Sequence, residues 1–252
     1  MATLISLALW GSISARAAGT GWYCARASEH RQPVADAPLR VVEEHGGYYI
    51  DHRHTDPNAD DKVVYLTFDV GYENGNVARV LDALRNEGAT GAFFILGHVA
   101  ESESELVRRM ADEGHLVCNH TYSHRNLCGL GEGALAAELS HLEEVTRNTA
   151  GVVISKYYRP PEGKFDTAML DEAKALGYKT VFWSFAYADW DNAKQPSAEF
   201  AKKKILDNLH NGAVILLHPT SKTNADILGE VLGEMKAQGY RFGTLDELTG
   251  GA

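Results

Sequence analysis

From residue 62 onward, short apolar runs alternate with amphipathic segments, and most of those segments stop at a glycine. The run 63–68 is apolar and β-branched, which is typical of a strand buried on both faces of a parallel sheet. Residues 76–87 then carry apolar side chains at helical spacing and precede Gly88, a common helix stop. The cycle repeats along the chain. It predicts seven strands, at 63–68, 91–96, 115–119, 156–159, 179–184, 213–217 and 240–242.

This alternation predicts an α/β fold, a parallel sheet with helices outside it. The seven repeats favour a distorted (β/α) barrel, with an open doubly wound sheet as the alternative. The sequence has neither a G-x-G-x-x-G motif after the first strand nor a Walker A motif, so it lacks the residues of a nucleotide-binding fold. Helices are expected at 76–87, 103–113, 132–150, 166–176, 197–209 and 224–238.

The chain before residue 62 lacks this pattern. Residues 18–61 are polar, and we expect an irregular extension packed on the main domain, 62–248, with one short helix near 39–45. Residues 1–17 combine a short apolar stretch with a small-x-small sequence, as a signal peptide does, although without a basic start. We therefore expect export to the cell envelope or beyond it, with a plain N-terminal tail as the alternative.

The composition of the chain argues against nucleic acid and a membrane as its partners. Lys plus Arg number 24 and Asp plus Glu 34, so the formal charge is −10, which argues against a nucleic-acid partner. No run approaches the ~20 apolar residues of a membrane span. Three cysteines are too few for a disulfide framework. Cys118 is expected to be a buried thiol, while a bridge to Cys128 stays open for an exported protein. We expect a monomer.

Titratable residues follow six of the expected strands at their carboxyl ends. Active sites of parallel α/β folds lie at that end of the sheet, so these side chains are expected to share one site. His52 and His54, in the extension, are instead expected to be solvated loop residues. The strand-end set is Asp69, His98, His120 with His124, Arg159, Asp189 and His218.

His120 and His124 have H-x-x-x-H spacing, which on a helical turn places both imidazoles on one face, where they can share a divalent ion. Asp69 ends a buried strand and needs a partner, and Arg159 is the arginine at a strand end. We interpret Asp69 as a general base that activates water beside the metal and is oriented by Arg159. The alternative is a structural ion pair at the rim of the barrel.

His218 directly follows an apolar strand, and Asp189 lies in the segment after the predicted strand 179–184. A neighbouring carboxylate raises the pKa of an imidazole, so His218 paired with Asp189 would stay protonated and donate to a leaving group. The alternative is a core histidine with satisfied hydrogen bonds. Metal, base and separate acid together indicate hydrolysis of an amide or ester.

The rim of this site carries candidate substrate-binding residues. Two prolines precede Glu162 and fix a rigid turn, so the backbone N–H of Glu162 is placed to face an oxyanion. Tyr72 and Trp190 follow strand ends, where aromatic faces can stack on sugar rings. Core packing is the alternative for any one aromatic residue here, and it is what we expect of Trp183, which lies within a strand.

Five sequence motifs, at 67–75, 119–124, 159–163, 189–190 and 216–218, occur in the same order as in the polysaccharide deacetylases of the NodB-homology group, carbohydrate esterase family 4, and the chain resembles that group. Within that group the segments Gly-Tyr-Glu-Asn-Gly, Phe-Trp-Ser and Gly-Gly-Tyr-Tyr-Ile look most like the delta-lactam-biosynthetic de-N-acetylases, which deacetylate muramic acid in spore-cortex peptidoglycan. The resemblance covers about residues 62–248. Its motifs are Thr-Phe-Asp-Val-Gly-Tyr-Glu-Asn-Gly (67–75), Asn-His-Thr-Tyr-Ser-His (119–124), Arg-Pro-Pro-Glu-Gly (159–163), Asp-Trp (189–190) and Leu-Leu-His (216–218).

The resemblance implies a distorted (β/α) barrel and a metal-assisted N-deacetylase of peptidoglycan glycan strands. It implies that Asp69 is the base and Arg159 its tether, that Asp189 tunes the acid His218, and that His120 and His124 bind the metal. Most members have a second Asp as third ligand where this chain has Val70. A nitrogen-rich site favours Zn²⁺. The alternatives are a deacetylase of N-acetylglucosamine polymers and a glycan-binding protein that has lost catalysis.

Overall fold

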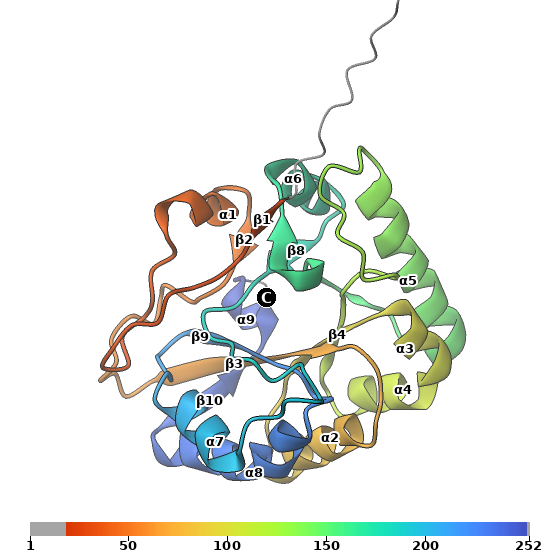
Figure 1. Cartoon of the computed structure of the whole chain (residues 1–252). Coiled ribbons are helices and arrows are strands. Elements are labelled where there is room, and N and C mark those ends of the chain that lie inside the picture. The colour runs from red at the N-terminus through yellow and green to blue at the C-terminus, as the bar shows by residue number, and fades with distance from the viewer. Residues whose placement is uncertain (1–18, 251–252) are drawn as a thin grey trace, which may run out of the picture.

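The computed structural model describes residues 19–250, in which a curved parallel sheet is wrapped by helices (Figure 1). All seven predicted strands are present and pair in parallel, so the predicted α/β barrel is confirmed as seven strands curled into a half-barrel. Their bounds are β3 Lys62–Val70, β4 Ala92–Ile95, β5 Leu116–Asn119, β6 Ser155–Tyr158, β8 Lys179–Val181, β9 Ala213–Leu217 and β10 Tyr240–Gly243.

The long strand β3 is the centre of the sheet. It pairs with β9 along Val64–Phe68, and along its other edge first with β10 and then with β4. From β4 the sheet continues through β5, β6 and β8. Beyond β8, a bridge between Phe185 and Ile215 brings the chain back to β9. This contact curls the sheet so that the carboxyl ends of its strands converge.

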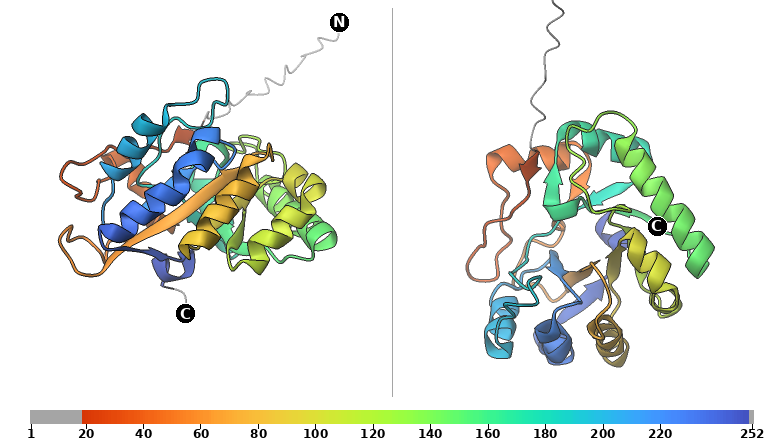
Figure 2. Two further views of the ribbon diagram at one scale, coloured as in Figure 1. Left: turned by 90° about the horizontal axis from the view of Figure 1, so that it is seen from below. Right: turned by 45° about the vertical axis from the view of Figure 1, so that its right-hand side comes forward.

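Helices cover the outside of the sheet, and α8 lies beside α2 over β3 (Figure 2). The six predicted helices are confirmed, with Asp166 as the N-cap of α6, where its side chain accepts from the backbone N–H of Met169. Two further helices, α3 and α9, are too short to give a periodic signal. The bounds are α2 Asn76–Glu87, α3 Gly97–Ser102, α4 Ser104–Asp112, α5 Ala134–Ala150, α6 Thr167–Ala175, α7 Ala198–Leu206, α8 Lys222–Ala237 and α9 Leu245–Leu248.

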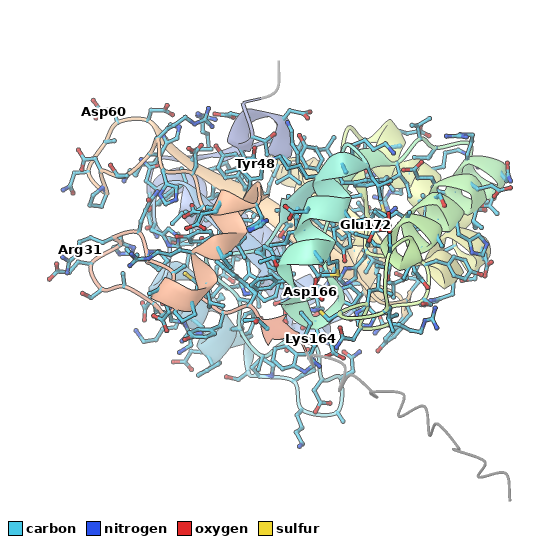
Figure 3. All side chains as sticks on the ribbon, turned by 90° about the horizontal axis from the view of Figure 1, so that it is seen from above. Arg31, Tyr48, Asp60, Lys164, Asp166 and Glu172 are labelled. Atoms are coloured by element: carbon cyan, nitrogen blue, oxygen red, sulfur yellow. The ribbon has the colours of Figure 1, made fainter. Side chains whose placement is uncertain are left out.

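The N-terminal extension is more ordered than the sequence indicates. It contains the expected short helix, as a 3-10 turn, Ala37–Leu39, and α1, Val41–Glu44, which lies beside α6 (Figure 3). It also supplies β2, Gly47–Tyr48, which pairs in parallel with β8 and so joins the barrel sheet. A second pair joins β1, Thr20–Gly21, to β7, Lys164–Phe165. Strands of two residues are too short to leave a pattern in the sequence.

Alternation along β3 determines which side chains enter the barrel. Val64, Leu66, Phe68 and Val70 belong to the apolar cluster beneath the helices. The intervening residues face the opposite side of the strand, because successive side chains of a strand point to opposite faces. Asp69 therefore projects into the barrel interior.

Other expectations concern single residues. The cysteines at 24, 118 and 128 are free in the structure, and Cys118 is buried as expected. His52 pairs with Glu43, away from the strand ends. Among residues 19–250, no helix combines the length and apolar character that crossing a membrane requires. The signal-peptide segment, 1–17, lies outside the described residues.

Candidate active site

The carboxyl ends of β3, β5 and β6 bring Asp69, His120 and Arg159 into contact. Nη1 of Arg159 donates to Oδ1 of Asp69 at 2.8 Å, and Nε2 of His120 lies 3.5 Å from Oδ2 of the same carboxylate. Burial works to raise the pKa of Asp69, but neighbouring positive charge, above all that of Arg159, outweighs it and holds that pKa below its usual value. Asp69 is therefore a carboxylate with one oxygen anchored and the other available to accept a proton.

Arg159 is fully buried, and hydrogen bonds from three of its side-chain nitrogens fix its position. Besides Asp69, the guanidinium donates to the carbonyls of Val181 at 2.9 Å and Phe182 at 3.1 Å. It also donates to Oγ1 of Thr67 at 2.9 Å. Thr67 lies two residues before Asp69, on the same face of β3, so strand alternation could have indicated it, although its role was not predicted.

His120 is oriented by a main-chain bond. Its Nδ1 donates to the carbonyl of Arg159 at 2.8 Å, which leaves the lone pair of Nε2 facing the site. Burial is the largest influence on this imidazole and lowers its pKa to about 4. The ring is therefore neutral, as a metal ligand must be.

The imidazole of His124 lies beside that of His120, with 5.0 Å between ring centroids. The predicted helical turn is wrong, because bends and irregular chain follow β5 here. Thr121 and His124 adopt left-handed backbone with φ of 70° and 57°, and Oγ1 of Thr121 accepts from the N–H of His124 at 3.0 Å. This strained turn brings the two rings together in place of a helix face.

These residues fit a divalent ion with two protein ligands. His120 and His124 would supply two nitrogens, and no group of three His, Cys, Asp or Glu side chains in residues 19–250 is arranged to hold a metal. Val70 packs in the apolar cluster beneath the helices, opposite to Asp69, and offers no ligand atom. The remaining ligands would have to come from water or substrate.

His218 follows β9 and pairs with Asp189, as predicted. Its Nδ1 contacts Oδ1 of Asp189 at 2.7 Å, and its backbone N–H donates to Oδ2 at 2.8 Å. Burial works to lower the pKa of His218, but Asp189 and the more distant Asp69 outweigh it and raise that pKa above 6.5. With Nδ1 held by the carboxylate, Nε2 is the atom that can give up a proton.

The three predicted substrate-binding residues, Tyr72, Glu162 and Trp190, are exposed at the rim of the site. Trp190 is 60% exposed and its ring centroid lies 6.1 Å from that of His218. Tyr72 is 45% exposed, and its hydroxyl accepts from the side chain of Asn192. Glu162 has left-handed backbone, with φ of 57°, and its carboxylate pairs with Lys164.

Trp183 packs against the core, as expected, and it also lies beside Arg159. It is only partly buried, and the guanidinium of Arg159 lies 5.7 Å from its ring centroid. Its ring packs on Gly163, where φ is 64° and an added Cβ would lie 2.7 Å from the indole. A glycine is required there on both counts.

Asn119 and Ser123 shape the histidine loop without contacting either imidazole. The amide of Asn119 donates to the carbonyl of Leu139 at 3.1 Å, and its oxygen accepts from the N–H of Thr121 at 2.9 Å. The hydroxyl of Ser123 donates to Glu138 at 2.7 Å. Their part is to hold the loop that carries the ligands.

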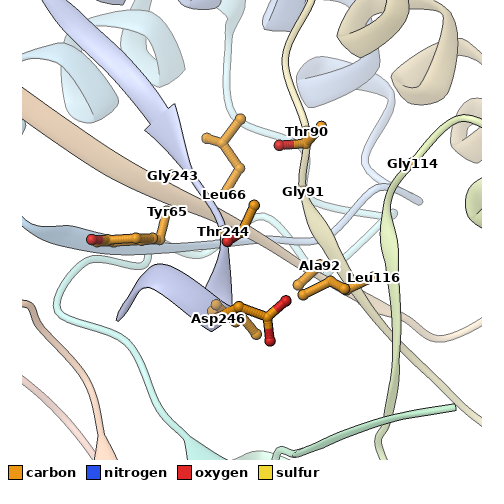
Figure 4. Close-up of a pocket in the computed structure, with 11 residues that line it drawn as sticks. Tyr65, Leu66, Thr90, Gly91, Ala92, Gly114, Leu116, Gly243, Thr244 and Asp246 are labelled. Atoms are coloured by element: carbon orange, nitrogen blue, oxygen red, sulfur yellow. The ribbon is translucent and has the colours of Figure 1, made fainter. Parts of the chain in front are cut away.

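The cavity in Figure 4 is a different feature. It has a volume of about 190 Å³ and lies where β4 and β5 begin, at the end of the barrel opposite Asp69 and Arg159. Its lining includes Gly91, Leu116 and Asp246 but no residue of the site described above. Active sites of parallel barrels lie at the other end, so we assign no catalytic role to this cavity.

A buried carboxylate lies beside two imidazoles, and a third histidine is held by its own carboxylate. This is the arrangement that a hydrolase needs for general acid–base chemistry on an acyl group. The sequence model of the polysaccharide deacetylase family matches residues 56–181, which include Asp69, His120, His124 and Arg159. The chain belongs to this family of polysaccharide deacetylases, as a NodB-type member of carbohydrate esterase family 4.

Relatives extend the match beyond residue 181. The chain is 37% identical over 228 residues to peptidoglycan-N-acetylmuramic acid deacetylase PdaA of Bacillus subtilis, covering 90% of this chain and 84% of that protein. The solved structure of Bacillus subtilis PdaA, a family 4 carbohydrate esterase, superposes with a TM-score of 0.83 at 36% identity, over 92% and 97% of the two chains. A peptidoglycan-N-acetylglucosamine deacetylase of Bacillus cereus is 34% identical over 189 residues, covering 73% of this chain and 67% of that protein.

Proposed function

We propose that this deacetylase removes the N-acetyl group from N-acetylmuramic acid residues of peptidoglycan, at positions free of peptide, as a step toward muramic δ-lactam in spore cortex. The observation that carries the reaction is the pairing of Asp69 with Arg159 on one side and of His218 with Asp189 on the other. The muramic acid substrate is supported by the 37% identity to a protein of that activity.

The base step follows from the asymmetric environment of Asp69. Arg159 occupies Oδ1, so Oδ2 accepts the proton of a water molecule whose oxygen attacks the acetamide carbonyl carbon. The fixed guanidinium prevents the carboxylate from turning away. A divalent ion held by His120 and His124, with Zn²⁺ favoured, would polarise the acetamide carbonyl. The backbone N–H of Glu162 is proposed to donate to the developing oxyanion.

The acid step needs a proton on the opposite side of the amide. The carbon–nitrogen bond breaks as Nε2 of His218 gives its proton to the departing nitrogen, which leaves acetate and a free amino sugar. Asp189 supports the imidazolium by accepting from Nδ1 at 2.7 Å. Tyr72 and Trp190 are proposed to bind the sugar rings beside the scissile group.

A deacetylase of N-acetylglucosamine polymers is the second candidate, because another relative is a peptidoglycan-N-acetylglucosamine deacetylase. Both substrates are glycans with an acetamide, so the acid, the base and the two imidazoles would act in the same way. A peptidoglycan substrate places the enzyme in the cell envelope or outside the cell. A role restricted to glycan binding is not supported, because acid and base are both assembled.

The test measures acetate released from peptidoglycan whose muramic acid has been freed of peptide, in parallel with a polymer of N-acetylglucosamine. Release from the first substrate, abolished in Asp69→Asn and His218→Ala proteins that remain folded, is the expected result. Faster release from the second would replace the muramic acid assignment. Full activity of both variants would overturn the mechanism.

A further inference from the structure

The carboxylate of Asp189 has more partners than the acid His218. It is 1% exposed, and its Oδ2 accepts from the backbone N–H of His218 at 2.8 Å and from Nδ2 of Asn224 at 2.6 Å. Asn224 lies in the first turn of α8 and is itself buried. A buried amide that donates to a catalytic carboxylate can fix which of its two oxygens faces the histidine.

The orientation of the Asn224 amide is itself determined. The hydroxyl of Tyr187 donates to Oδ1 of Asn224, so the NH₂ group must point the other way, toward Asp189. The same NH₂ reaches the carbonyl of His218 at 3.2 Å. Tyr187 is buried against Phe185, with 6.3 Å between ring centroids. Tyr187, Asn224, Asp189 and His218 therefore form one continuous chain of hydrogen bonds.

Helix capping does not account for Asn224. The N-cap of α8 is Ser221, whose Oγ accepts from the backbone N–H of Asn224 at 3.1 Å. The side chain of Asn224 does not cap the helix. It bonds instead to Asp189 and to the carbonyl of His218. The carbonyl of Thr220, in the same loop, is bonded separately by Asn74 at 2.9 Å and Asn76 at 3.1 Å.

We propose that Asn224 and Tyr187 are positioning residues for the acid step. Tyr187 fixes the orientation of the Asn224 amide, and the amide holds Oδ2 of Asp189 by a hydrogen bond. Oδ1 of Asp189 thereby stays hydrogen-bonded to Nδ1 of His218. Without this support the carboxylate can turn, and the imidazole loses the tautomer and direction that present a proton at Nε2. This inference rests on the proposed role of His218 as acid.

The experiment compares Asn224→Ala and Tyr187→Phe with two controls. Asn76→Ala removes a buried amide bonded to the same loop, and Tyr157→Phe removes a hydroxyl bonded to Asp246, which lines the cavity at the opposite end of the barrel. Acetate release from peptide-free peptidoglycan gives kcat and KM. Proton NMR on protein with ¹⁵N-labelled histidine gives the downfield Nδ1–H signal of His218, assigned by its absence in His218→Ala.

We expect kcat to fall about tenfold in Asn224→Ala and less in Tyr187→Phe, with KM within about twofold of the parent, since the lost contact serves chemistry rather than binding. The Nδ1–H signal should broaden or vanish in both variants and persist in both controls. If Asn224→Ala does not fold, Tyr187→Phe carries the test, because it deletes only a hydroxyl. Parent-like kcat and an unchanged signal in both variants would overturn the positioning role. An active His218→Ala protein would instead remove the acid role on which the inference rests.

Discussion

The main-chain carbonyl of Arg159 accepts the Nδ1 proton of His120 at 2.8 Å, while the side chain of Arg159 binds Asp69 at 2.8 Å. One residue thus orients the imidazole of His120 with its backbone and the carboxylate of Asp69 with its guanidinium. The register of β6 beside β5 makes this double contact possible, because the N–H of Arg159 donates to the carbonyl of Asn119 at 3.0 Å. The carboxylate of Asp69 and the imidazole of His120 therefore cannot shift independently of each other.

Replacing Arg159 with Ala should lower both stability and activity. The change leaves Asp69 as an unpaired charge at 10% side-chain exposure, and removing one member of a buried pair costs about 3–5 kcal/mol. Urea denaturation measures the loss, and acetate release should fall below detection. Arg85→Ala is the control, because the side chain of Arg85 is itself 56% exposed and an ion pair of an exposed arginine is worth about 1 kcal/mol or less. Equal stability losses in the two variants would contradict the argument.

The pH profile should report the acid. His218 donates only when protonated, so kcat/KM should be level below its pKa and fall as pH rises through it, at a value above 6.5. The groups that set this value are Asp189 and Asp69, which raise the pKa, and Arg159, which lowers it together with burial.

Asp189→Asn tests the assignment of that alkaline limb. The variant removes the main opposing charge, so burial then dominates and the limb should move to lower pH. Asp191→Asn, a neighbouring exposed acid, should leave the limb in place. An unmoved limb in Asp189→Asn would show that another group titrates.

Metal removal should reduce acetate release, and added Zn²⁺ should restore it. Two imidazoles bind an ion more weakly than a set with a third ligand, so brief dialysis against a chelator should suffice. His124→Ala should need more Zn²⁺ than the parent, measured by calorimetry as well as by activity. His45→Ala, which contacts Asp171 on α6, is the control. Activity indifferent to both chelator and Zn²⁺ would exclude the ion from the reaction.

Sequence reasoning located Asp69, His120, Arg159 and His218 because apolar runs mark the strands locally and parallel strands bring their carboxyl ends together. It missed the approach of Trp183 to Arg159, and it missed Asn224, for a different reason. The ring of Trp183 packs on Gly163, which permits an approach that only the folded loop reveals. Asn224 lies on a helix six residues after His218, and nothing in its spacing indicates that Tyr187 orients its amide. Strand β2 was missed because two residues carry no period.

The extension should be integral to the active enzyme. Trp22 is 5% exposed. Its indole N–H donates to the carbonyl of Trp183 at 2.9 Å, and its backbone N–H donates to the carbonyl of Gly163 at 2.9 Å. Trp22→Ala should therefore cost about 3–5 kcal/mol and reduce activity by loosening the loop after Arg159. Tyr23→Ala, its 51% exposed neighbour, should cost far less. An active, stable Trp22→Ala protein would separate the extension from the site.

The last prediction concerns the exposed ring beside the acid. Trp190 is 60% exposed yet lies only 6.1 Å from the ring of His218, so an exposed indole stands where a sugar would bind. Trp190→Ala should raise KM roughly fivefold, the equivalent of about 1 kcal/mol, with kcat nearly unchanged. Phe200→Ala on α7, a 53% exposed aromatic, should change neither value. A fall in kcat alone would assign Trp190 to the acid step, because a platform used equally by bound substrate and transition state changes KM and not kcat.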